Sequence, residues 1–122
     1  PFGLRGLLYV RMSEMTTMLA PEQFELSGAP DVANVPAGGS RSRNVDLAAG
    51  RCYVLLGVGG RAVTDIAMTL RRGNTVVAEA PAGASAQIRH CPEAGRAGRH
   101  QLTVRLAASS GQVLTQVYEH SD

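Results

Sequence analysis

Apolar residues recur at every second position along much of this chain, and this alternation constrains the fold more than any other feature. It is clearest in VTDIAMTL, residues 63–70, and in RHQLTVRL, residues 99–106. A period of two is typical of a β-strand with one buried face. We therefore expect the apolar side chains of both stretches to face one core: Ile66, Met68, Leu70, Leu102, Val104 and Leu106.

Seven strand-like stretches follow one another, and residues that favour turns separate them. RRGN and PEAGRAG are two of these separators, and no helix-length period lies between the stretches. The pattern predicts an all-β fold, an antiparallel jelly-roll-like sandwich of about seven to eight strands. The expected strands are residues 43–47, 51–58, 63–70, 75–79, 86–91, 99–106 and 112–118.

The stretch AAGRCYVLLGVGG, residues 48–60, fits either a buried strand or a strand that feeds a glycine-rich phosphate loop. A phosphate loop needs a helix directly after its glycines, because the helix N-terminal amides bind the phosphate. Here a two-period stretch follows instead, and the chain contains no lysine. The sequence favours a buried strand that ends in a tight turn.

The two cysteines, Cys52 and Cys91, each lie at an end of an expected strand. Cysteines in such positions suit a disulfide between neighbouring strands, although two buried free thiols are the alternative. A disulfide would place the protein outside the cell, at the cell surface or in the periplasm. We predict the Cys52–Cys91 bond and that location.

The N-terminal third of the chain has a different residue pattern from the rest. Residues 3–19 carry one apolar stripe at helical spacing and predict an amphipathic helix, with a β-strand as the alternative. Residues 20–42 hold three prolines and predict a packing loop with one short strand near residues 24–27. We therefore divide the chain into residues 1–42, helix and packing loop, and residues 43–122, the sandwich.

The helical stripe must be buried on some surface. One possibility is the chain's own sandwich, and the other is another subunit, because methionine-rich surfaces adapt to partners. We assign the stripe to association with a partner. Its residues are Leu4, Leu8, Met12, Met15 and Leu19.

Residues 43–118 resemble the bacterial pre-peptidase C-terminal domains and their CUB-like relatives in exported proteins. The resemblance rests on short motifs around Leu47, Gly50 and Tyr53, on Asp65–Ile66, and on Gly98 with the strand 102–104. It implies an exported β-sandwich. Some relatives bind calcium or collagen, but Ala67 stands where their second acidic residue would be, so the resemblance does not extend to a metal site.

All twelve basic residues are arginines, and they are scattered from Arg5 to Arg105. The scatter indicates that a genome rich in G and C causes the use of arginine in place of lysine. The alternative is a surface of guanidinium groups that bind carboxylates or phosphates. The formal net charge is only +2 and aromatic residues make up 4%. Nucleic-acid binding is therefore not expected.

No catalytic or metal-binding pattern stands out. His90 and Cys91 are sequence neighbours, which point to opposite faces of a strand and cannot easily share an ion, and His100 and His120 stand alone. A Ser109–His90–Asp65 triad can be named, but Ser109 lies in an ordinary turn sequence. Asp65 and Glu79 could meet across strands. We expect no catalytic residue, no metal and no cofactor.

The predicted function is non-enzymatic. We expect an exported module of a surface or extracellular assembly that associates with other protein subunits, copies of this chain among them, and that has no membrane span. The alternative is a ligand-binding accessory module, for a carbohydrate or a matrix protein, attached to a secreted enzyme. The scarcity of aromatic residues counts against sugar stacking.

Overall fold

The computed structural model describes residues 10–13 and 24–120. Within them all strand pairing is antiparallel, so the predicted all-β, antiparallel architecture is confirmed. The described residues contain nine strands, where the sequence predicted about seven to eight. They are β1 (Phe24–Leu26), β2 (Asp31–Val35), β3 (Ser40–Leu47), β4 (Cys52–Gly59), β5 (Ile66–Arg72), β6 (Thr75–Gly83), β7 (Ser85–His90), β8 (Gly98–Leu106) and β9 (Gly111–His120).

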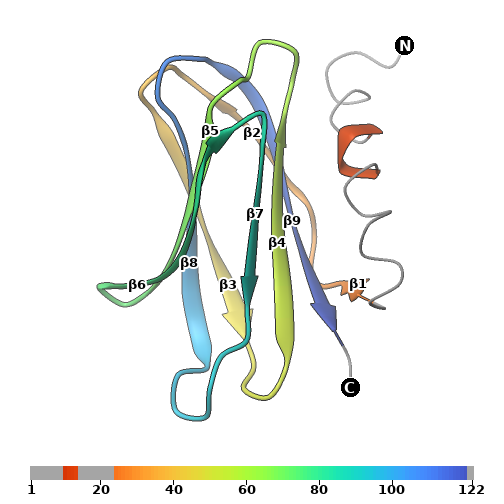
Figure 1. The fold of residues 1–122 in the computed structure, drawn as a ribbon, viewed down its shortest axis with the longest axis vertical. Helices are drawn as coiled ribbons and strands as arrows, with labels where there is room; N and C mark the ends of the chain where they lie inside the picture. Colours follow the sequence, from red (N-terminus) through yellow and green to blue (C-terminus); the bar gives the residue numbers. More distant parts are fainter. Residues whose placement is uncertain (1–9, 14–23, 121–122) are drawn as a thin grey trace.

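The strands form two sheets that pack against each other (Figure 1). Sheet A has the order β7–β4–β9, and both β1 and β2 pair with the remaining edge of β9. Sheet B has the order β3–β8–β5–β6. The chain passes from β6 in sheet B to β7 in sheet A through the single residue Ala84, so these two edge strands are consecutive in the chain.

The main hydrophobic core lies between the sheets and draws alternate residues from both. All six side chains that the alternation of β5 and β8 assigned to one core are at most 2% exposed, so that prediction is confirmed. Opposite them, sheet A contributes inward side chains of β4, β7 and β9, among them Leu55, Ile88, Val113 and Val117.

Strand β4 is buried on both faces, as its nearly continuous apolar run predicts. Tyr53 and Leu55 face the main core, while Val54, Leu56 and Val58 belong to a second cluster on the outer face of sheet A. The prediction of a buried strand for this glycine-containing stretch is confirmed.

The segment before β3 departs from the sequence prediction. The short strand expected near residues 24–27 is present as β1. The interpretation of the rest of residues 20–42 as loop is wrong at β2, which pairs with β9 along its full length, and β3 begins at Ser40. The sheets therefore recruit residues on the N-terminal side of the boundary that the sequence placed at residue 43.

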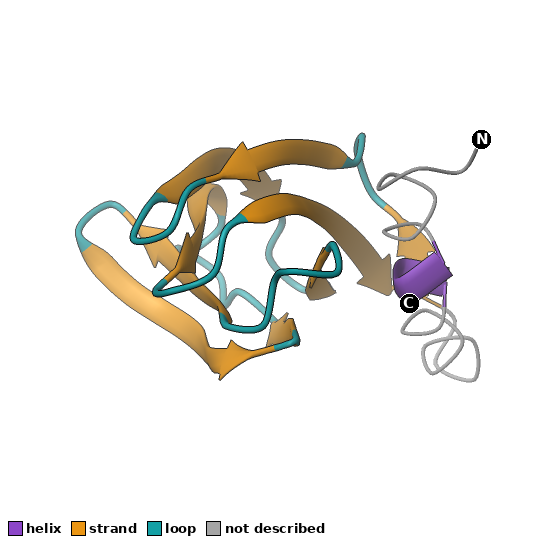
Figure 2. Cartoon of the chain, turned by 90° about the horizontal axis from the view of Figure 1, so that it is seen from above, coloured by secondary structure: helices purple, strands orange, loops and turns teal. Residues whose placement is uncertain are grey.

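Residues 10–13 form one helical turn, which lies outside the two sheets (Figure 2). The rest of the predicted helix, residues 3–9 and 14–19, falls outside the described residues. Within the described part of the chain, no helix has the length and apolar character needed to cross a membrane.

Candidate functional site

The two cysteines form a disulfide, as predicted. Cys52 is the first residue of β4, and Cys91 directly follows β7, its neighbour in sheet A. Their sequence separation is 39. Closing a loop of this length stabilises a fold by roughly 4 kcal/mol in the chain-entropy model.

Two histidines meet beside this disulfide. His90 ends β7 in sheet A and His100 lies in β8 of sheet B, and their ring centroids are 5.7 Å apart. His100 is 1% exposed, its Nδ1–H donates to the Gly98 carbonyl at 2.9 Å, and its Nε2 has no hydrogen-bond partner among the described residues. The interpretation of His100 as a lone histidine is therefore wrong, because the packing of the sheets brings it against His90.

The surroundings of His90 favour its neutral form. Burial lowers the pKa of His90, and the electrostatic interaction with the nearby His100 lowers it further. His90 also lines a hollow of about 280 Å³, together with residues 75–77 of β6 and with Pro92, Glu93 and Arg96. Among the described residues, no group of three or more histidine, cysteine or acidic side chains is placed to hold a metal ion.

The nominal triad is not assembled. Asp65 accepts hydrogen bonds from the Ser109 hydroxyl and, at 2.7 Å, from the Ala108 amide, and these bonds lower the pKa of Asp65. His90 is far from this contact. It pairs with Tyr53 near the start of β4, whereas Asp65 comes after the end of β4 at Gly59. Tyr53 and Gly59 are roughly 20 Å apart at 3.3 Å per residue. The Asp65–Ser109 contact instead joins the β4–β5 connection to the β8–β9 turn.

Asp65 and Glu79 are not brought together either. Glu79 pairs with Thr69 within the β5–β6 ladder, whereas Asp65 precedes β5 and is bound to the β8–β9 turn. Paired carboxylate chemistry therefore has no geometric support at these two residues.

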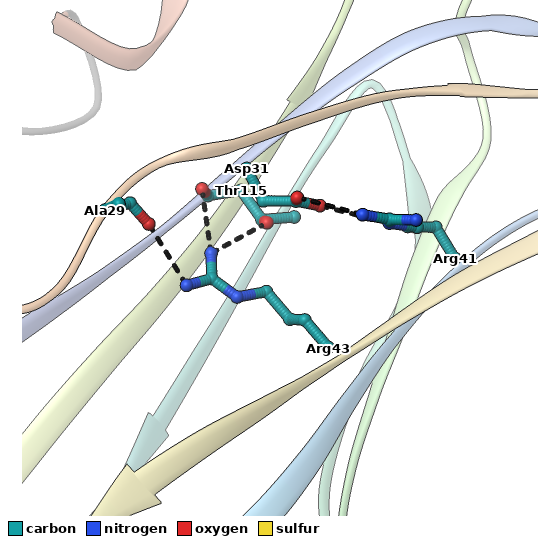
Figure 3. A network of polar contacts seen from close by, with 5 residues as sticks. All are labelled: Ala29, Asp31, Arg41, Arg43 and Thr115. Atoms are coloured by element: carbon teal, nitrogen blue, oxygen red, sulfur yellow. Dashed lines mark hydrogen bonds and ion pairs between the residues drawn. The ribbon is translucent and has the colours of Figure 1, made fainter.

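A polar network closes the side of the sandwich where β2 and β3 lie next to each other (Figure 3). The Arg41 guanidinium forms an ion pair with Asp31 at 3.2 Å, which raises the pKa of Arg41 through a hydrogen bond and opposite charge. Arg43 reaches from β3 in sheet B to the Ala29 carbonyl at 3.1 Å and to the carbonyl and hydroxyl of Thr115 at 3.4 Å. Thr115 is buried, so the network seals the seam between the sheets.

Sequence reasoning missed this network, although a signal was present. Arg43 and Arg41 lie two and four positions before Val45, so strand alternation turns both toward the face that Val45 buries. Their acceptors lie in other strands, and the sequence gives no indication of which strands those are.

The outer face of sheet A is apolar and covered. Met12 is 2% exposed and clusters there with Val54, Leu56, Val58 and Leu114. Arg11 adds a directional contact, since its Nη1 donates to the Gly59 carbonyl at 2.8 Å. Of the five residues assigned to association, only Met12 is described, and it packs on the chain's own sheet. Leu4, Leu8, Met15 and Leu19 lie outside the described residues.

The outer face of sheet B is polar and uncovered. Its outward positions alternate with the buried ones along β3, β8 and β5, and they carry serine, threonine, amide and arginine side chains together with Asp46 on β3 and Ala67 on β5. Ser42 and Thr103 form a hydrogen bond across two of these strands at 2.9 Å. The two outer faces of the molecule therefore differ completely in chemistry.

No family model matches the chain, and no curated protein matches it. Among solved structures, the chain is similar to the solution NMR structure of a de novo designed double-stranded beta-helix. The identity is 14%, the match covers 75% of this chain and 99% of that chain, and the TM-score is 0.39. The resemblance to pre-peptidase C-terminal domains stays a prediction.

Proposed function

We propose that this chain is a non-enzymatic, exported module that works by associating with other protein subunits, copies of itself among them, at a cell surface or outside the cell. We further propose that its sandwich is of the jelly-roll-like kind found in pre-peptidase C-terminal domains. The disulfide supports export, since such bonds persist in oxidising compartments.

The observation that carries the proposal is the third layer on sheet A. A sheet that is apolar on both faces needs a cover on each, and residues 10–13 contribute to the cover on the outer face. The turn at residues 10–13 and strand β1 lie on the same side of the molecule (Figure 1). Val10 of the turn is 54% exposed, and Leu26 of β1 is 52% exposed. This side combines a packed apolar layer with exposed apolar side chains, which suits contact with another subunit.

Sedimentation velocity over a concentration series tests the proposal. We expect the wild-type protein to self-associate and the Val10→Ser/Leu26→Ser variant to stay monomeric with an unchanged unfolding midpoint. Val76→Ser is the matched control, because Val76 is 45% exposed but lies on β6 in sheet B. A wild-type protein that is monomeric throughout, or a control that dissociates the assembly equally, would contradict the proposal.

A further inference from the structure

The outer face of sheet B has a distinct charge pattern. Its two central strands, β8 and β5, present Arg99, Gln101, Thr103 and Arg105 from the first, and Thr69 and Arg71 from the second. We call these six side chains the central strip. Carboxylates border the strip from the two edge strands: Asp46 on β3 is the register partner of Arg99, and Glu79 on β6 is the register partner of Thr69. The strip itself carries three positive charges and no negative charge.

Four arginines outside the strip are held by groups of the protein, whereas the three arginines of the strip are not. Arg11, Arg41, Arg43 and Arg51 are each engaged by a carbonyl, a hydroxyl or a carboxylate of the protein. The side chains of Arg71, Arg99 and Arg105 form no hydrogen bond or ion pair among the described residues. Their guanidinium donors are therefore available to a ligand.

The strand register sets the spacing of these three groups. Arg71 lies opposite Gln101, and Arg99 is two positions along β8, so Arg71 and Arg99 are diagonal neighbours about 7–8 Å apart. Arg105 is six positions beyond Arg99, roughly 20 Å away at 3.3 Å per residue. Thr103 and Thr69 pair with each other between the two ends. Positive groups thus flank a stretch of hydroxyl and amide groups along the strand direction.

This spacing favours an extended polymer with repeated negative groups. Guanidinium forks match sulfate and carboxylate oxygens, and the hydroxyl and amide groups between them match the hydroxyl groups of a sugar chain. The strip has no aromatic side chain on which bases could stack. It also has no free strand edge to which a peptide could add, because β8 and β5 are both paired on both sides.

We propose that the central strip binds a linear acidic polysaccharide through Arg71, Arg99 and Arg105. This inference goes beyond the proposed association of subunits, which uses the opposite side of the sandwich. The ligand lies along β8, with its sulfate or carboxylate groups on the guanidinium groups and its neutral groups on Thr103, Thr69 and Gln101.

Binding of the intact protein to dextran sulfate, with unsulfated dextran as the neutral control, tests the proposal. We expect binding only to the sulfated polymer, weakening by roughly one to two orders of magnitude between about 50 and 200 mM salt if three charge contacts form. Polygalacturonate is a second probe, which distinguishes carboxylate from sulfate as the preferred group. Binding to either acidic polymer supports the proposal, and binding to neither overturns it.

Two triple variants with the same change in charge locate the site. Arg71→Gln/Arg99→Gln/Arg105→Gln should weaken binding at least about tenfold, while Arg61→Gln/Arg72→Gln/Arg96→Gln should change it less than about threefold, since interface charges act locally at moderate salt. The side chains of the control residues are likewise without a partner in the described structure. If the strip variant does not fold, Gln101→Glu, which adds one carboxylate in the strip, should weaken binding instead.

Three results would overturn the proposal. Equal losses in both triple variants would show general charge attraction rather than a site. Binding of polyglutamate or of single-stranded DNA at least as tight as that of the acidic polysaccharides would show that the polymer class is wrong. Unchanged binding in both the strip variant and Gln101→Glu would show that another surface binds the polymer.

Discussion

At Gly59 the end of β4 runs so close to the following turn that a side chain has no room. A Cβ atom built there would lie 2.3 Å from Cγ1 of Val63, which is itself 2% exposed. The valine side chain is stiff and sits against the core, so it cannot easily move away. The second glycine of the GVGG stretch is therefore needed for close packing.

We predict that Gly59→Ala lowers the free energy of unfolding by about 1–3 kcal/mol, because the added methyl group overpacks the site. Val63→Ala should relieve this clash, so the double variant should lose less stability than the two single variants together. Denaturant unfolding of all four proteins measures the coupling. Strict additivity would show that Gly59 and Val63 do not compete for the same space.

At the scale of single residues, the sequence predicts which face of a strand a side chain lies on, but not which residue of another strand it contacts. Alternation assigns His100 to the same face as Leu102, and that face is buried. It cannot show that His90 lies 5.7 Å away, because His90 belongs to the other sheet and only the packing of the sheets brings the rings together. The cysteines were predictable because both mark ends of strands that are neighbours in one sheet.

At the scale of elements, the helical turn at residues 10–13 packs on sheet A through one buried side chain, Met12. Met12 is 2% exposed, whereas Val10 in the same turn is 54% exposed. The contacts of Met12 come from β4 and β9, the central strands of sheet A. Met12 therefore belongs to the packed structure of the chain, whatever surface the rest of the N-terminal stripe contacts.

We predict that Met12→Ala lowers the free energy of unfolding by about 2–4 kcal/mol, through lost burial and the cavity left behind. Val10→Ala, the matched control in the same turn, should change it by less than about 0.5 kcal/mol. Chemical denaturation of both variants decides this. Equal, small effects at the two positions would mean that the turn does not pack on sheet A in solution.

Strand β2 shows why some elements escape sequence prediction. DVANV lies between Pro30 and Pro36 and buries fully only Val35, so its alternation is weak. It becomes a strand because β9 offers a free edge with matching register from Gly111 to Thr115. The longer strands β4, β5 and β8 were predictable because their own residue patterns indicate burial of one or both faces.

For the whole molecule, the two outer faces are chemically opposite. The outer face of sheet A is apolar and packs against Met12 of the turn at residues 10–13, while that of sheet B is polar and carries guanidinium groups that have no partner among the described residues. One side of the sandwich is closed by the chain passing from β6 to β7, and the other by the network of Arg41 and Arg43. The two contacts that we propose therefore use separate faces of one small fold.

Two residues at opposite ends of the sandwich, His90 and Asp65, make the stability of the fold depend on pH. The pKa of His90 is lowered from 6.5, so below about pH 6.5 the unfolded chain binds more protons at this residue than the folded chain does. Stability therefore falls as the pH decreases through this window. The pKa of Asp65 is lowered from 3.8, so the stability that Asp65 contributes above that pH is lost as the pH falls further through its lowered pKa.

We predict two separable steps in a plot of unfolding free energy against pH. His90→Gln should reduce the loss between about pH 7 and pH 5, where histidines titrate, and leave the step below about pH 4 in place. Asp65→Asn should do the reverse, so each variant is the control for the other. Denaturant unfolding at closely spaced pH values measures both steps. If His90→Gln kept the full loss above pH 5, the burial of His90 at the disulfide end would not be what couples the stability of this fold to pH.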